Sequence, residues 1–218
     1  MKRKGCTCIY VLLSLTFIIV NLATLSNLAP WIDEVMMLDT SYNAAVHGSW
    51  ETTAWYRVAG QSPFPTYPPL YQLLATAWIW LFGGSLVMVR SLNLLITFVQ
   101  GCACLLLMKR HGLRLTPRTT TLFTMLLWGT EEMAWIYRNG RADILCALSF
   151  VFTIWTIEHH RLEQSPTTRI AVIVASATLT SSGVQAAVYL CAIWLFSFIA
   201  TKGQRKECGR LFILLLTG

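Results

Sequence analysis

The segment Ile9–Ala29, IYVLLSLTFIIVNLATLSNLA, is long and apolar enough to cross a membrane, which indicates an integral membrane protein. At about 1.5 Å per helical residue, these 21 residues cover a hydrocarbon core of roughly 30 Å. The apolar part of a secretory signal peptide is shorter, about 7 to 15 residues, and no convincing small-x-small cleavage site follows here. The sequence therefore predicts an uncleaved first span.

The composition of the whole chain agrees with a membrane protein. Of 218 residues, 55% are hydrophobic and 12% are charged, whereas a soluble domain carries about a quarter charged residues. This excludes a disordered chain and an ordinary cytosolic enzyme. The seven Cys form no Cys-x-x-Cys pair and no Cys/His cluster, so neither a disulfide scaffold nor a zinc site is expected. The sequence predicts an all-α, polytopic integral membrane bundle of about six spans.

Residues 1–218 are expected to form a single membrane domain. After the first span at 9–29 comes an external loop at 31–69, followed by a re-entrant helix and further spans at 70–200 and the start of a truncated span at 211–218. The external loop should contain a juxtamembrane helix, because apolar residues recur at three- and four-residue steps from Val35 to Val46 and Gly48 supplies a stop. The later apolar runs lie at 70–82, 86–108, 119–136, 143–157, 170–181 and 184–200.

The basic residues give the orientation of these spans. The net charge of +7 comes from Lys and Arg that lie in short connections, not on a soluble surface that would bind nucleic acid. Cytoplasmic loops are rich in Lys and Arg. If 70–82 dips into the membrane and returns, every such loop is cytoplasmic. A full span at 70–82 would instead place the loop with Lys109, Arg110, Arg114 and Arg118 outside. The Lys and Arg residues of the loops expected to be cytoplasmic are Lys2, Arg3, Lys4, Lys109, Arg110, Arg114, Arg118, Arg161, Arg169, Lys202, Arg205, Lys206 and Arg210.

Two charged constellations then face the outer side together. Asp33-Glu34 follows the first span, where an acidic pair also suits a helix N-terminus. Arg138, Arg141 and Asp143 lie between two apolar runs, where a local Arg–Asp pair in an exposed loop is the simpler alternative. Two outer Arg nevertheless oppose the positive-inside bias, which indicates an anionic ligand such as a phosphate.

Other polar residues give weaker indications. Glu131-Glu132 precedes Trp135 near the outer end of a span, either lining a cavity or, more simply, lying at the interface. The isolated His residues lack acidic or Cys partners at ligand spacing, so no metal site is predicted.

In order along the chain, these motifs resemble the N-terminal part of the polyprenyl-phosphate-sugar-dependent glycosyltransferases of the GT-C fold. Protein O-mannosyltransferases and lipid A aminoarabinose transferases are the most similar types. The matching motifs over residues 1–160 are Asp33-Glu34, Tyr67-Pro68-Pro69-Leu70, Phe82-Gly83 with Arg90, and Arg138, Arg141 and Asp143. Tyr67 stands where the family has His or Lys, and family members are at least twice as long.

The resemblance implies inverting transfer of a sugar from a polyprenyl-phosphate donor to a hydroxyl on the external face, the acceptor being a lipid, a glycan or a protein. Asp33, or less readily Glu34, would be the general base, and Asp143 would assist it or orient an Arg. Arg138, Arg141, Arg90 and Tyr67 would bind substrate. No cofactor is implied, a divalent cation is not indicated, and the location would be a bacterial inner membrane.

A different class of protein is also compatible with the sequence. A non-catalytic polytopic membrane protein, such as a transporter fragment, a lipid-binding subunit or a truncated remnant, would have the same hydropathy pattern. The sequence of the chain leaves both hypotheses open.

Overall fold

All regular structure in the described part of the chain is helical. The computed structural model describes residues 2–27, 29–54, 69–163, 165–183 and 185–200, and no strand occurs among them. The predicted all-α class is therefore confirmed for these residues. The helices are α1 (Lys2–Thr24), a 3-10 turn (Leu25–Asn27), α2 (Ile32–His47), α3 (Pro69–Phe82), α4 (Leu86–Arg110), α5 (Pro117–Gly129), α6 (Glu131–Arg138), α7 (Asp143–Glu163), α8 (Pro166–Thr180) and α9 (Ala186–Ala200).

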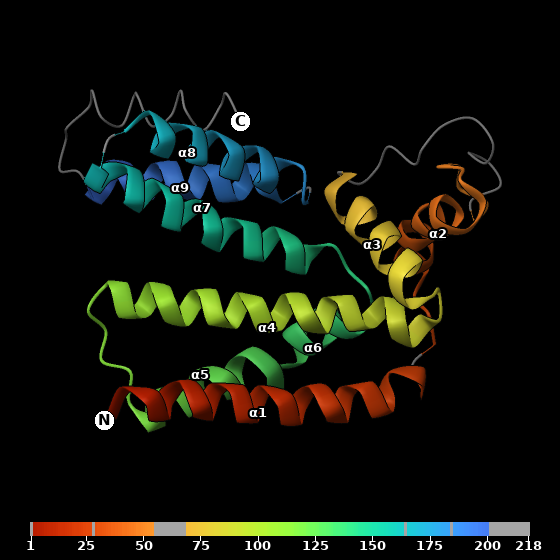
Figure 1. Cartoon of the computed structure of the whole chain (residues 1–218), viewed down its shortest axis with the longest axis horizontal. Coiled ribbons are helices and arrows are strands. Elements are labelled where there is room, and N and C mark those ends of the chain that lie inside the picture. Colours follow the sequence, from red (N-terminus) through yellow and green to blue (C-terminus); the bar gives the residue numbers. More distant parts are fainter. Residues whose placement is uncertain (1, 28, 55–68, 164, 184, 201–218) are drawn as a thin grey trace.

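The long helices run side by side, and α2 and α3 pack together at one end of them (Figure 1). α4 lies between α1 and α7, and α7 contacts the pair α8 and α9. The N-terminus and the α4–α5 connection lie at the end opposite to α2 and α3 (Figure 1). Apolar clusters fill the contacts of α1 with α4 and α5, of α4 with α3 and α7, and of α7 with α8 and α9.

Two of the described helices are long and apolar enough to cross a membrane: Gly5–Asn27 and Leu86–Arg110. α6 and α7 meet the same criterion as a pair but bend by 108° at the break between them. α3 has 14 residues, about 21 Å of helix, which is too short for a hydrocarbon core of roughly 30 Å. The re-entrant path of 70–82 and the count of six spans remain predictions.

The apolar run at 119–136 is not one helix, which corrects the sequence prediction. α5 ends at Gly129, Thr130 has an extended backbone with ψ 145°, and α6 begins at Glu131. The cause is local, because Gly weakens a helix and acidic residues favour the first turn of a new one. The break brings Glu131 and Glu132 to a helix N-terminus.

The helix predicted after the first span is confirmed. α2 covers Ile32–His47, and Gly48 ends it with φ 70° in the left-handed conformation, as its sequence position indicated. Leu38 of this helix is buried against α3 and α4, whereas Val35 and Val46 are exposed. Its position on a membrane surface remains a prediction.

Asp39 of α2 accepts hydrogen bonds from the loop that follows the helix. Its carboxylate accepts hydrogen bonds from the hydroxyls of Thr52 (2.8 Å) and Thr53 (2.9 Å) and from the amides of Thr53 (2.5 Å) and Ala54 (2.9 Å). Partial burial alone would raise the pKa of Asp39, but the hydrogen bonds from Ala54, Thr52 and Thr53 together hold this pKa below 3.8. The loop therefore stabilises the ionised carboxylate.

Replacing Asp39 by Asn is expected to lower the free energy of unfolding by about 1 to 2 kcal/mol at neutral pH, because each hydrogen bond contributes about 1 kcal/mol net. A pKa depressed by folding stabilises the protein above the unfolded value of about 4, and this contribution is lost as pH falls through the folded value. Thermal unfolding from pH 7 to pH 3 should therefore show wild type and D39N converging at the acidic end. E51Q, which removes a charge from the same loop, is the control; a constant gap between D39N and wild type contradicts the prediction.

Candidate functional site

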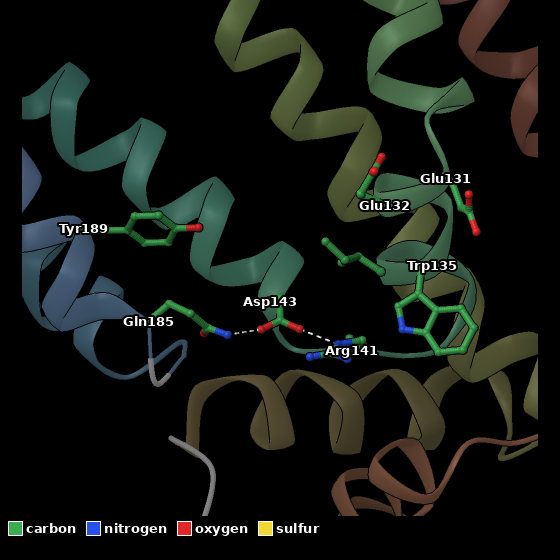
Figure 2. A pocket seen from close by; sticks show the side chains of 8 residues that line it. Glu131, Glu132, Trp135, Arg141, Asp143, Gln185 and Tyr189 are labelled. Atoms are coloured by element: carbon green, nitrogen blue, oxygen red, sulfur yellow. Dashed lines mark hydrogen bonds and ion pairs between the residues drawn. The ribbon is translucent and has the colours of Figure 1, made fainter.

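A pocket of about 700 Å³ opens between α6, the start of α7 and the start of α9 (Figure 2). It gathers side chains that are far apart in the sequence. The residues that line it are Glu131, Glu132, Trp135, Ile136, Arg141, Asp143, Gln185 and Tyr189. The predicted residues Arg141 and Asp143 thus lie in one cavity, together with the acidic pair Glu131-Glu132.

Arg141 is held in place by a carboxylate and an aromatic ring. Its Nε donates to Asp143 Oδ2 at 2.5 Å, and its guanidinium carbon lies 5.2 Å from the ring centroid of Trp31. Among the described residues, no hydrogen bond joins either Nη atom of Arg141 to a partner. Because a guanidinium has five N–H donors, most of this group is available to an anionic ligand.

Asp143 connects the pocket to α9. One carboxylate oxygen accepts from Arg141, and the other accepts a hydrogen bond from Gln185 Nε2 (Figure 2). Asp143 also begins α7, where a negative charge complements the helix dipole. With both oxygens engaged, Asp143 fixes the position of Arg141.

Buried polar groups shape the turn from which Arg141 and Asp143 project. Gly140 has φ 60°, and a Cβ at this position would lie 2.9 Å from Glu34 Oε1, so both backbone conformation and space require glycine. The amide of Asn93 in α4 donates to the carbonyl of Arg141 at 2.9 Å. The hydroxyl of Tyr71 in α3 lies 2.8 Å from the Gly140 carbonyl. Hydrogen bonds from α3 and α4 therefore fix the turn that carries Arg141 and Asp143.

Arg138 has different neighbours from Arg141. Its Nη2 donates to Thr24 Oγ1 at the end of α1, at 3.2 Å. Its Nε is buried without a hydrogen-bond partner among the described residues, and it does not line the pocket. The joint action of the two arginines on one phosphate remains a prediction.

Glu34 and Arg90 bind each other inside the protein. Arg90 Nε and Nη2 donate to the two carboxylate oxygens of Glu34 at 2.7 and 2.6 Å, and the side chains are 1% (Glu34) and 0% (Arg90) exposed. Arg90 also donates to the Leu25 carbonyl at 2.7 Å. In this conformation neither side chain lines the pocket, so neither can act on a ligand bound there.

Two expected site residues are not placed by the structure. Tyr67 lies outside the described residues, and so does the side chain of Asp33, whose backbone belongs to α2. Gln185 and Tyr189 were missed in the sequence. Gln185 lies 42 residues from Asp143 along the chain, and no local pattern marks such a contact.

The charged side chains that line the pocket indicate what kind of ligand it can bind. Three carboxylates, from Glu131, Glu132 and Asp143, face one guanidinium, that of Arg141. The described residues contain no group of three or more His, Cys, Asp or Glu side chains that could hold a metal ion. Among the residues that line the pocket, Arg141 is the one cation, so an anionic part of a ligand would bind there, and the rings of Trp135 and Tyr189 offer apolar faces.

Comparisons with protein-family models, with curated proteins and with solved structures gave no match for this chain.

Proposed function

We propose that this chain is a multi-pass membrane glycosyltransferase, or the N-terminal part of one, that transfers a sugar from a polyprenyl-phosphate donor to a hydroxyl on the external face. The observation that carries the proposal is the pocket, in which Arg141 and Asp143 of the family-like motif meet two further carboxylates and two aromatic rings. The reaction class comes from the order of the sequence motifs along the chain, which resembles that in polyprenyl-phosphate-sugar-dependent glycosyltransferases.

The ends of the helices support an outward-facing pocket. Arg138 binds Thr24 at the end of α1, and Arg141 packs on Trp31 just before α2, so the pocket lies at the end of the bundle where the first apolar helix finishes. The Lys/Arg-rich α4–α5 connection and the N-terminus lie at the other end (Figure 1). Under the positive-inside rule that other end is cytoplasmic, in keeping with an inner-membrane protein of a bacterium.

Different side chains of the pocket suit different parts of the donor, the phosphate and the sugar. The free Nη groups of Arg141 bind the phosphate, with the bidentate geometry that guanidinium groups offer to phosphate oxygens. Charge that develops on the departing phosphate is then stabilised by a preorganised cation. Asp143 holds that cation through its 2.5 Å contact. Trp135 and Tyr189 offer apolar ring faces to the sugar.

Thermal unfolding of the detergent-purified chain with polyprenyl phosphate tests this proposal. A ligand at about 100 times its dissociation constant should stabilise the protein by roughly 2.7 kcal/mol. We expect this shift in wild type and its loss in R141Q, because the phosphate then has no cation in the pocket. R114Q, in the α4–α5 connection at the other end of the bundle, is the matched control and should keep the shift. No shift in folded wild type, or an equal shift in R141Q, contradicts the proposal.

A non-catalytic lipid-binding protein gives a different result in the same samples. It would show the Arg141-dependent shift but would not release polyprenyl phosphate from a sugar-loaded donor. Donor turnover therefore separates the two hypotheses.

A further inference from the structure

The acidic side chains in and near the pocket differ in how many of their carboxylate oxygens already accept hydrogen bonds. Glu34 is buried and holds Arg90 with both oxygens. Asp143 also uses both oxygens, for Arg141 and Gln185. Glu131 and Glu132 are exposed to the pocket and have no hydrogen bond or ion pair with any described residue. A general base needs a free lone pair within reach of the hydroxyl that it deprotonates, and only the last two offer one among these four carboxylates.

The helical position distinguishes Glu132 from Glu131. Glu132, Trp135 and Ile136 are spaced i, i+3 and i+4, so they share one face of α6, and all three line the pocket. Glu131 is rotated by about 100° along the helix and lies at the edge of that face. In the view of Figure 2, Glu132 is on the side of α6 nearer to Asp143 and Tyr189, and Glu131 is farther from them.

We propose that Glu132 is the general base that deprotonates the acceptor hydroxyl. This inference rests on the function proposed above and extends it to a residue outside the motifs of the resemblance. The Glu132 carboxylate takes the proton of the acceptor hydroxyl as the hydroxyl oxygen forms a bond to the anomeric carbon. The bond from that carbon to the phosphate oxygen breaks, and its electron pair leaves with the lipid phosphate, which Arg141 binds. The proton on Glu132 is then lost to water.

A structural role is the alternative for both glutamates. Carboxylates in the first turn of α6 stabilise the helix dipole, typically by about 0.3 to 1 kcal/mol, and this effect is shared by Glu131 and Glu132. E131Q therefore removes the same charge from the same turn and is the matched control for E132Q.

The experiment compares two acceptors with the reconstituted chain of residues 1–218 and polyprenyl-phosphate mannose as donor. Methanol must lose a proton to react, whereas azide attacks the anomeric carbon without a base. We expect E132Q to slow transfer to methanol by about 10²- to 10⁴-fold while transfer to azide stays within severalfold of wild type. E131Q should change the rates with methanol and with azide by the same factor, because Glu131 lines the pocket but is not the base.

Three results would overturn the assignment, and they are distinguishable. Transfer to methanol at a rate near that of wild type in E132Q excludes Glu132 as the base. Loss of transfer to methanol in D33N, with azide transfer retained and E132Q active, assigns the base to Asp33 instead. Equal losses with both acceptors in E132Q and E131Q indicate the structural role. Wild type that releases no polyprenyl phosphate with either acceptor, and that shows no thermal shift with polyprenyl phosphate, refutes the proposed function itself, before any variant is compared.

Discussion

Replacing Glu34 by Gln is expected to lower the free energy of unfolding by about 3 to 5 kcal/mol, because it leaves the buried guanidinium of Arg90 without its counter-charge. The two side chains are 1% and 0% exposed and share two hydrogen bonds of 2.7 and 2.6 Å. Water cannot replace the lost carboxylate at such a position. Reversible unfolding by SDS in mixed micelles measures the difference.

The cost of E34Q should fall when Arg90 is also replaced. In the double variant E34L/R90M no charge is left buried, and replacing a whole buried pair by apolar residues is often close to neutral. Some loss should remain, because Arg90 also donates to the Leu25 carbonyl. We therefore expect the double variant to be more stable than either E34Q or R90M.

Glu158 provides a control on the other side of the protein. It pairs with His111 at 2.6 Å but is 22% exposed, and its partner is 55% exposed. Pairs of this kind contribute about 0 to 1 kcal/mol, so E158Q should change stability little. A cost of E34Q as small as that of E158Q would show that the Glu34–Arg90 pair is hydrated in solution.

The sequence predicts those parts of the fold that depend on local signals. Gly48 marks the end of α2 because only a residue free of a Cβ adopts its left-handed conformation readily. The apolar lengths of α1 and α4 are properties of single segments. The break between α5 and α6 also has a local signal in the sequence, Gly129-Thr130 followed by two glutamates. The long apolar run at 119–136 nevertheless led to the prediction of one uninterrupted helix.

Contacts between distant segments could not be predicted in the same way. Glu34 and Arg90 are 56 residues apart. The resemblance implied that Glu34 was an alternative general base and that Arg90 bound substrate, and no local pattern joined the two residues. Their pairing depends on how α2 packs against α4. Likewise, Arg141 and Asp143 form a local pair that the spacing allowed, whereas the contribution of Gln185 depends on the position of α9.

Replacing Gly101 by Ala is expected to destabilise the contact between α1 and α4, although Ala is the better helix former by up to about 1 kcal/mol. A Cβ at residue 101 would lie 2.0 Å from Tyr10 Oη and 2.6 Å from Leu127 Cδ2. Tyr10 is 1% exposed and donates to the Phe98 carbonyl at 2.7 Å, so it cannot move aside without losing that bond. Overpacking of about 1 to 3 kcal/mol and a lost hydrogen bond of about 1 kcal/mol exceed the helical gain.

G5A separates the two effects of this substitution, because a Cβ at Gly5 of α1 would meet no atom within 4 Å. G5A should leave stability equal or slightly increased, and G101A should reduce it in the same SDS titration. The loss in G101A should also shrink in a Tyr10→Phe background, which removes the nearest overlapping atom. If G101A costs as much in Tyr10→Phe as in wild type, the overlap with the Tyr10 hydroxyl is not its cause. If G101A instead stabilises the chain as G5A does, α1 and α4 lie farther apart in the membrane than the packing of Tyr10 on Gly101 requires.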